Sequence, residues 1–244
     1  MKRTVLISGA STGIGAAAAI ELAPESFVFI HYNASEDAAR KVLAEVEKHG
    51  GSGALLKADV GSEAECARMV EEVKAKTDHL DVLVNNAGGM LERRSFADGL
   101  NWDLMDRTFR INTYSAMYMT SNLLPLLRKG TNPCVINVTS VAIRHGAPTA
   151  TIYGACKAAL DSFTRGAAKE LGPDIRVNAV APGVIETPFH DRYSTPEKMQ
   201  QFKEATPLKR NGEAHHIAHA IRFLVENTFI TGETVDVNGG IYMR

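Results

Sequence analysis

A glycine-rich turn between a short apolar strand and a helix, at the amino end of the chain, is the feature that most constrains the fold. Residues 3–7 (Arg-Thr-Val-Leu-Ile) predict a buried strand, and residues 16–22 are strong helix formers. Between them, residues 8–15 have the sequence Ser-Gly-Ala-Ser-Thr-Gly-Ile-Gly. A strand, a glycine-rich turn and a helix in this order open a dinucleotide-binding βαβ unit. The glycines allow the backbone to approach a pyrophosphate, and the helix start offers unpaired N–H groups to its oxygens.

Strand-like and helix-like segments alternate along the rest of the chain. Alternation of this kind predicts a parallel sheet with helices on both faces and right-handed crossovers. No linker or repeat divides the 244 residues. We therefore predict one doubly wound Rossmann-type α/β domain with a seven-stranded parallel sheet, spanning residues 1–244 with a substrate lid at about 186–209. The further strands are expected at 27–32, 54–58, 82–85, 134–138, 176–180 and 234–237, and the further helices at 35–49, 62–76, 102–127, 152–171 and 213–225.

The composition argues against several classes of partner and site. The formal net charge is −1 and no basic stripe is present, so neither nucleic acid nor an anionic membrane is expected to bind. No signal-peptide core opens the chain and no apolar run reaches transmembrane length. Cys66, Cys134 and Cys156 are odd in number and lack metal-site spacing, which predicts reduced thiols in a cytoplasmic protein and no catalytic metal. Cys156 is read as a small packing residue rather than a redox-sensitive thiol.

A second pattern indicates proton-transfer chemistry. Tyr153 precedes Lys157 by four residues, so the two side chains share one face of the predicted helix. An ammonium beside a phenol lowers the pKa of the phenol, which can then exchange a proton with a substrate oxygen near neutral pH. Ser140 follows a predicted strand at its carboxyl end, where its hydroxyl can hold a substrate oxygen. The simpler alternatives are a surface lysine and a turn serine.

Taken together, the motifs resemble those of the classical short-chain dehydrogenases/reductases, in particular the 3-oxoacyl-carrier-protein reductases. The likeness runs from Arg3 to about Tyr242 and departs at Ser8, where the family usually has threonine. It is carried by the Gly-x-x-x-Gly-x-Gly loop at 9–15, by Asn85-Asn86-Ala87-Gly88, by Asn112, Ser140, Tyr153 and Lys157 in order, and by Pro182-Gly183-Val184-Ile185-Glu186-Thr187.

The resemblance implies a role for each member of this tetrad. Tyr153 would be the general acid/base, and Ser140 would hold the substrate oxygen. Lys157 would lower the pKa of the tyrosine and hydrogen-bond the nicotinamide ribose. Asn112 would support a water-linked proton relay to Lys157. Asparagine is also a poor residue for a helix interior, so Asn112 marks a kink, a site or an ordinary buried amide.

The resemblance further implies a nicotinamide cofactor along the carboxyl edge of the sheet. Asp59 would accept a hydrogen bond from the adenine amino group, with Val60 beside the ring. Thr187 would contact the carboxamide or the phosphates. The other expected cofactor contacts are Gly9, Ser11, Thr12, Gly13, Ile14, Gly15, Asn86, Ala87, Gly88, Pro182, Gly183 and Ile185.

The end of the second strand bears on the choice of cofactor. Tyr32 stands where an acidic residue would accept from the ribose 2′-hydroxyl and repel a 2′-phosphate. Asn33 and Ser35 follow and offer donors to a 2′-phosphate at the start of the next helix, whereas Glu36 would partly oppose one. Thr12 occupies a position that is basic in many NADP-preferring relatives. We expect a modest preference for NADP(H), with NAD(H) also accepted.

The sequence and the resemblance predict an NAD(P)(H)-dependent oxidoreductase that interconverts a secondary alcohol and a carbonyl. The substrate would be a ketone, a sugar or a 3-oxoacyl compound. The alternative is a catalytically silent NAD(P)-binding regulator on the same fold. The resemblance points to a homotetramer, with a dimer as the main alternative, and apolar residues of the 102–127 helix were expected to contribute to the interface: Ile111, Met117, Met119 and Leu123.

The substrate pocket is expected from three segments: 89–95, 141–149 and 186–206. Cationic side chains in them favour recognition of a carboxylate or phosphate, and a solvated loop surface is the alternative reading. These side chains are Arg93, Arg94, Arg144, His145 and His190.

Overall fold

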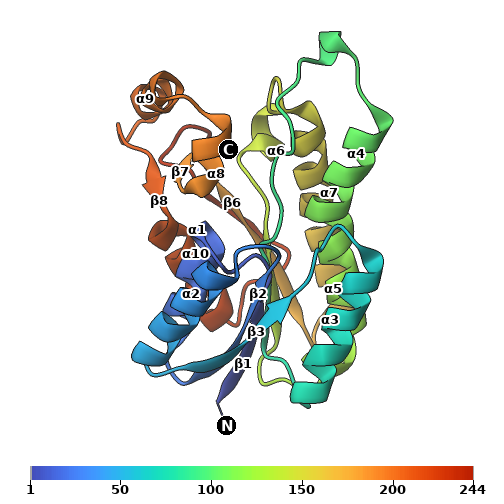
Figure 1. Cartoon of the computed structure of the whole chain (residues 1–244). Helices are drawn as coiled ribbons and strands as arrows, with labels where there is room; N and C mark the ends of the chain where they lie inside the picture. The colour runs from blue at the N-terminus through green and yellow to red at the C-terminus, as the bar shows by residue number, and fades with distance from the viewer. Residues whose placement is uncertain (1, 244) are drawn as a thin grey trace.

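A sheet of seven parallel strands lies at the centre of the computed structural model, which describes residues 2–243, with only the backbone described at 190–192 (Figure 1). The strand order is β3-β2-β1-β4-β5-β6-β9. The strands are β1 (Arg3–Ile7), β2 (Ser26–Tyr32), β3 (Ser52–Lys57), β4 (Val82–Asn85), β5 (Cys134–Val138), β6 (Arg176–Pro182) and β9 (Thr234–Val237). The predicted fold class is confirmed.

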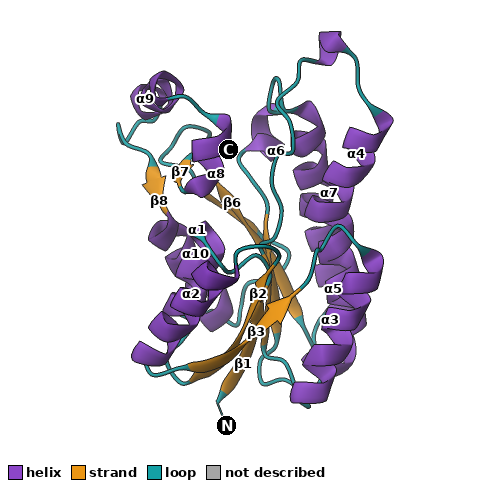
Figure 2. Ribbon diagram, viewed as in Figure 1, coloured by secondary structure: helices purple, strands orange, loops and turns teal. Residues whose placement is uncertain are grey.

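Helices cover both faces of this sheet (Figure 2). On one face lie α1 (Gly13–Glu21), α2 (Glu36–Lys48) and α10 (Ala214–Glu226), and on the other lie α3 (Glu63–Lys76), α5 (Ser115–Leu127) and α7 (Thr151–Leu171). Side chains of a strand alternate between faces, so Val5 and Ile7 pack in the first layer while Leu6 packs in the second. Strands buried on both faces appear as continuous apolar runs, which is why their positions were predictable.

The predicted helix is helical over its whole predicted length, 102–127, but it changes type within that length. The structure has α4 (Trp102–Phe109), a π-helical turn over Arg110–Tyr114, and then α5. The interruption falls around Asn112, the residue that fits a helix interior poorly.

Two of the residues expected at a subunit interface lie instead in the core of the chain. Met119 is 1% exposed and Leu123 is 0% exposed, and both pack against the sheet in the layer that contains Leu6. That part of the interface reasoning was wrong, because helical spacing alone did not show which face of α5 meets the sheet.

The region 186–209, predicted to be a substrate lid, contains regular structure. A short strand β7 (Ile185–Glu186) pairs with β8 (Gly212–Glu213), and α8 (Pro188–Tyr193) and α9 (Pro196–Ala205) lie between them. Together these elements form a small lobe above the carboxyl ends of β6 and β9 (Figure 1).

Strands β2 and β3 are added to one edge of β1, and β4 is added to its opposite edge, so the strand order reverses between β1 and β4. A ligand crevice forms at such a switch point, outside the carboxyl ends of the strands. The loops after β1, β4 and β5 all end there, together with α6 (Ala142–His145). The loop after β4 also contains a short 3₁₀ turn, Phe96–Asp98. Within residues 2–243, no helix combines the length and apolar character needed to cross a bilayer.

Candidate active site

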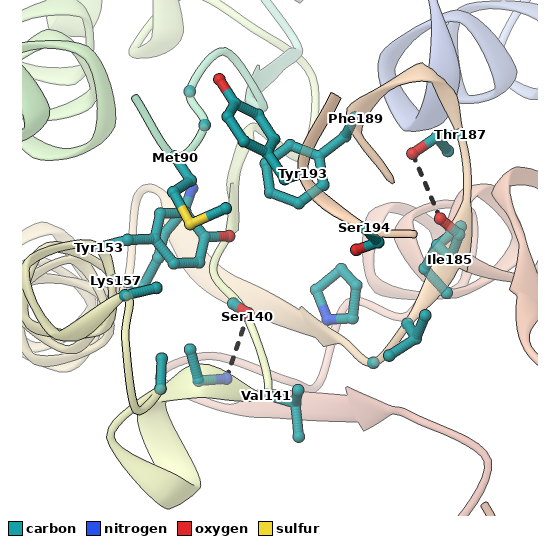
Figure 3. A pocket seen from close by; sticks show the side chains of 18 of the residues that line it. Met90, Ser140, Val141, Tyr153, Lys157, Ile185, Thr187, Phe189, Tyr193 and Ser194 are labelled. Carbon is teal, nitrogen blue, oxygen red and sulfur yellow. Dashed lines mark hydrogen bonds between the residues drawn. The ribbon is translucent and has the colours of Figure 1, made fainter. Parts of the chain in front are cut away.

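A cavity of about 850 Å³ lies at the carboxyl edge of the sheet. One side is formed by the glycine loop, the opposite side by α7, and the outer wall by α8 and α9. Figure 3 shows Tyr153, Lys157 and Ser140 on one side of this cavity, facing Phe189 and Tyr193. The residues predicted from three distant parts of the sequence are therefore brought together at one site.

Ser140 and Tyr153 are hydrogen-bonded through their hydroxyl groups. Ser140 also accepts a hydrogen bond from the Ala142 backbone N–H at 3.1 Å, which holds its side chain at the end of β5. Lys157 is 3% exposed, and its Nζ donates to the Val138 carbonyl at 2.8 Å. Its Nζ lies 5.9 Å from the centroid of the Tyr153 ring. The serine is thus held just beyond the end of β5, and the lysine is bonded to the last residue of that strand.

The resemblance implies that Lys157 lowers the pKa of Tyr153, and burial of the phenol acts in the opposite direction. Burial raises the pKa of Tyr153 above its ordinary value of 10.0, and the hydrogen bond to Ser140 opposes that rise. Burial also lowers the pKa of Lys157 to about 8, so the nearby ammonium itself is destabilised. At neutral pH the phenol therefore keeps its proton, which is the form that donates to a carbonyl oxygen.

Asn112 joins the π-turn to the loop after β4. Its Oδ1 accepts from the Gly89 N–H at 2.9 Å, and its Nδ2 donates to the Gly89 carbonyl at 2.8 Å and to the Thr108 carbonyl at 2.9 Å. Gly88, at φ +148°, lies so close that a Cβ there would be 2.5 Å from Asn112 Oδ1. The amide of Asn112 thus binds the loop backbone, and its support of a water-linked relay to Lys157 stays a prediction.

The glycine loop forms a cradle that side chains would fill. A Cβ on Gly15 would lie 2.3 Å from the Gly9 carbonyl oxygen, and one on Gly13 would lie 3.3 Å from Thr187 Cγ2. Thr12 is the N-cap residue of α1, yet its side chain makes no capping hydrogen bond. The helix start therefore keeps backbone donors available to an anion. These features fit the diphosphate of a nicotinamide dinucleotide.

His31 and Asn86 hold the backbone of the glycine loop in place by hydrogen bonds. The Gly9 N–H donates to His31 Nδ1 at 2.9 Å, and the His31 ring bonds the Ala58 carbonyl through Nε2 at 3.0 Å. Asn86 Nδ2 donates to the carbonyls of Ser8 and Gly9, both at 2.9 Å. Burial lowers the pKa of His31, so the ring is neutral and carries its proton on Nε2. The role of His31 was not predicted, because nothing in a strand sequence shows that a side chain reaches a neighbouring loop.

Ser8, the one departure noted in the loop, retains a structural function. Its hydroxyl accepts from the Asn86 and Ala87 N–H groups at 3.0 and 2.9 Å and donates to the Val84 carbonyl at 3.4 Å. A serine here links the ends of β1 and β4.

The expected adenosine end lies beyond the cavity, at the ends of β2 and β3. Tyr32 is hydrogen-bonded to Glu36, and the Glu36 carboxylate forms an ion pair with Arg40 at 2.5 Å. Ser35 is the N-cap residue of α2 but makes no capping hydrogen bond. Asp59 Oδ1 accepts from the Gly61 N–H at 2.8 Å, so this carboxylate stabilises its own turn and retains a second oxygen.

Most of the predicted site residues line the cavity, and the others lie outside its lining. Those outside its lining are Ser11, Gly15, Tyr32, Asn33, Ser35, Asp59, Val60, Ala87 and Asn112. Those that line it are Gly9, Thr12, Gly13, Ile14, Asn86, Gly88, Ser140, Tyr153, Lys157, Pro182, Gly183, Ile185 and Thr187.

The outer wall includes aromatic and sulfur-containing side chains that the sequence did not single out. The rings of Phe189 and Tyr193 are tilted against each other with their centroids 5.2 Å apart, and the Phe189 centroid lies 6.3 Å from that of Tyr153 (Figure 3). Met90 lies beside Tyr153, and Phe202 contributes from α9. No periodicity marks these residues, because their side chains converge only once α8 and α9 fold over the site.

The predicted cationic side chains separate into different environments. Arg144 is bound by two hydrogen bonds of 3.2 Å to Asp236, and Arg94 lies 3.7 Å from Glu92, so neither is a strong candidate for an anion. His145 stacks on Tyr242 at 4.7 Å and burial lowers its pKa. Arg93 lines the cavity. The side chain of His190 lies outside the described residues.

The three cysteines are buried free thiols. Burial raises the pKa of Cys156 to about 12, which fits the packing interpretation. In the part of the chain that the structure describes, no cluster of three or more His, Cys, Asp or Glu residues has the geometry to hold a metal ion.

Comparison with known proteins places this site in a family. A family model described as Enoyl-(Acyl carrier protein) reductase matches residues 9–242. The 3-oxoacyl-[acyl-carrier-protein] reductase FabG of Staphylococcus epidermidis is 34% identical over 247 residues, covering 100% of both chains.

Two solved structures share the whole fold. An NADH-dependent reductase, A1-R′, responsible for alginate metabolism, superposes with a TM-score of 0.90 and 32% identity, over 99% of this chain and 98% of the other. RhlG of Pseudomonas aeruginosa, in an NADP active-site complex, superposes with a TM-score of 0.90 and 29% identity, over 99% and 96%. The chain therefore belongs to the classical short-chain dehydrogenase/reductase family, and it is an NAD(P)-dependent oxidoreductase acting on alcohol and carbonyl groups.

Proposed function

We propose that this enzyme interconverts a ketone and a secondary alcohol, with Tyr153 as the acid/base and Ser140 and Lys157 as its partners. The observation that carries the proposal is the hydrogen-bonded Ser140–Tyr153 pair inside a cavity whose other side is the glycine cradle. Lys157, 5.9 Å from the phenol ring, completes the group.

Each residue has a distinct task in this proposal. The hydroxyls of Ser140 and Tyr153 converge on one substrate oxygen, and Ser140 stabilises the negative charge that develops there. Tyr153, protonated at neutral pH, gives its proton to that oxygen during reduction. Asn112 keeps the Gly88–Gly89 backbone in place beneath the site. A nicotinamide, when bound, supplies or accepts the hydride. The family also implies that Lys157 binds the nicotinamide ribose, and its free donors allow that.

The direct test is cofactor oxidation with a panel of ketones, aldehydes, sugars and 3-oxoacyl thioesters. We expect turnover with at least one ketone and its loss in Tyr153→Phe. A catalytically silent regulator would bind the cofactor and oxidise it with none of the panel.

We further propose a modest preference for NADP(H) over NAD(H). The Tyr32 position carries no carboxylate, and the charge of Glu36 is balanced by the Arg40 guanidinium, which lies one helical turn into α2. Arg40 can exchange this carboxylate for a 2′-phosphate without leaving the region. The A1-R′ reductase is described as NADH-dependent and RhlG as an NADP complex, so the cofactor preference of this enzyme is tested by its own steady-state kinetics. A kcat/KM more than about tenfold higher with NAD(H), about 1.4 kcal/mol, would contradict the proposal.

The lobe at 186–209 is proposed to act as a substrate lid. It contributes Phe189, Tyr193 and Phe202 to the outer wall of the cavity. If it closes over bound ligands, cofactor and substrate together should slow proteolytic cleavage in this segment. Unchanged cleavage with both ligands present would argue against a lid.

The proposed assembly is a homotetramer in the cytoplasm, with a dimer as the alternative. Trp102, at the start of α4, is 82% exposed, and Phe229, in the turn after α10, is 99% exposed. Helices α4 and α10 lie on opposite sides of the sheet (Figure 1). Large exposed apolar side chains on two faces suit two symmetric interfaces. Light scattering should give four times the mass of one chain, and cell fractionation should recover the enzyme with soluble cytoplasmic markers.

A further inference from the structure

We infer that the carbonyl substrate carries a compact anionic group, a carboxylate or a phosphate, held between Arg93 and Lys198 at the mouth of the cavity. This inference rests on the proposed function, because it names the class of molecule on which Tyr153 acts.

The first observation is the charge of the cavity wall. Among its described lining residues there are three Lys or Arg side chains and no Asp or Glu. Lys157 belongs to the catalytic group. Arg93 comes from the loop after β4, and Lys198 comes from α9 in the outer lobe. A cleft lined by one sign of charge concentrates ligands of the opposite sign.

The second observation is that neither cation forms an ion pair with a described carboxylate. Arg93 Nη1 donates to the hydroxyl of Thr149 at 3.0 Å, and Lys198 Nζ lies 5.3 Å from the centroid of the Phe202 ring. Within the described residues, no carboxylate lies at ion-pair distance from either one. Neighbouring cations differ in this respect: Arg94 lies beside Glu92 and Lys203 beside Glu186. Among the described residues, these nearby cations have a carboxylate partner, whereas Arg93 and Lys198, which line the cavity, do not.

The third observation is the conformation of the residue that holds Arg93. Thr149 is β-branched and yet has φ +65°, in the left-handed region. Such a conformation is unfavourable for a β-branched residue and persists only where the surroundings impose it. Here the Arg94 N–H donates to the Thr149 carbonyl at 2.7 Å, while Arg93 binds the Thr149 hydroxyl. The strained residue ties the arginine loop to the start of α7, four positions before Tyr153.

Apolar and aromatic side chains also line the cavity. Met90, Phe189 and Tyr193 lie there (Figure 3). The substrate is therefore a carbonyl compound with a short apolar or ring-like body and a terminal anion. The cofactor does not account for these cations, since its expected phosphate cradle is built from the glycine loop and Thr187 on another wall.

The test compares binding of matched anionic and neutral compounds. The probes are short oxo acids, their methyl esters, and phosphate analogues of the same skeleton. Binding is measured by calorimetry to the Tyr153→Phe enzyme loaded with reduced cofactor, so that affinity is read without turnover. We expect an anionic member to bind about tenfold more tightly than its ester, as charge-assisted hydrogen bonds allow. The carboxylate and phosphate arms show which anion is preferred.

Variants then locate the anion. Arg93→Gln and Lys198→Gln should each weaken binding of the acid, the double variant should remove its advantage over the ester, and ester and cofactor affinities should not change. Arg94→Gln is the matched control, because that neighbouring arginine already lies beside Glu92. Equal affinity for acid and ester, no binding of either, or an acid preference that survives the double variant would overturn the inference. The proposed function fails separately, if Tyr153→Phe retains turnover of a ketone that the parent enzyme reduces.

Discussion

Replacing His31 by glutamine should remove an acid-sensitive link beneath the cofactor loop. His31 is 2% exposed, and its Nδ1 accepts the Gly9 N–H while Nε2 donates to the Ala58 carbonyl. Both bonds require the neutral ring with its proton on Nε2. Protonation of Nδ1 would direct its N–H toward the Gly9 N–H. Two donors cannot form a hydrogen bond, so the charged ring loses the bond to Gly9.

The size of the effect follows from proton linkage. Burial lowers the pKa of His31 from its ordinary value of 6.5, against the opposing influence of the Ala58 carbonyl and the Asp59 charge. The stability that His31 contributes is therefore complete above about pH 6.5, and it is lost as the pH falls toward the folded-state pKa. The slope is at most about 1.4 kcal/mol per pH unit. From about pH 7 to about pH 5.5 the loss is at most about 1.3 kcal/mol, or roughly 3–5 °C in Tm for a chain of this length.

The assay is thermal unfolding and NADP(H) affinity across this pH range, in the parent enzyme, His31→Gln and His145→Gln. His31→Gln should lose less stability and less affinity on acidification than the parent. His145 is a matched control, because burial also lowers its pKa but its Nδ1 accepts from the Ala147 N–H and not from Gly9. His145→Gln should therefore keep the acid-induced loss of affinity. Any change in affinity that comes from titration of the cofactor itself is the same in all three proteins and cancels when they are compared.

An equal acid-induced loss of NADP(H) affinity in the parent and His31→Gln would refute the reasoning. Glutamine leaves either the Gly9 N–H or the Ala58 carbonyl without a good partner, at a cost of about 1–3 kcal/mol. If that variant does not fold, His31→Asn supplies a shorter amide with the same lack of titration.

Further predictions concern the catalytic group and the loop beside it. Tyr153→Phe should lower kcat by about 10²–10⁴-fold, the usual contribution of acid–base catalysis, with the cofactor dissociation constant nearly unchanged in calorimetry. Lys157→Ala should both lower kcat and weaken cofactor binding; unchanged affinity would remove the ribose assignment. Because burial raises the pKa of Tyr153, reduction should keep its rate through neutral pH while alcohol oxidation accelerates toward alkaline pH; an oxidation optimum in acid would contradict this. Gly88→Ala should lower the free energy of unfolding by about 2–4 kcal/mol, through its positive φ and the clash with Asn112, whereas Gly99→Ala, which has open space, should cost less in urea titrations.

The sequence predicted the sheet well because its strands are buried on both faces. Segments such as Val82–Asn85 are short, continuous and apolar, with helical patterns between them, and the structure places them where expected. The ends shifted slightly: β6 runs to Pro182 rather than to residue 180, because its pairing with β9 continues that far.

Contacts between distant segments were not predictable in the same way. Arg144 and Asp236 are 92 residues apart, and their ion pair removes a cation that loop composition alone left available to a ligand. The aromatic side chains that α8 contributes to the cavity were unpredictable for the same reason. These side chains line the cavity only because the lobe folds over it, and the local sequence does not indicate where the lobe lies.

Asn112 shows how a local misfit can report on a distant contact. An asparagine inside a helix lowers helix stability, and here the helix yields to a π-turn around it. Three hydrogen bonds to Gly89 and Thr108 offset that cost by satisfying backbone groups of the loop. The bonds to Gly89 fix the start of the segment that carries Met90 and Arg93 into the cavity. The π-turn thus connects the helix layer to the substrate side of the site, so a change at Asn112 should disturb substrate binding as well as the fold.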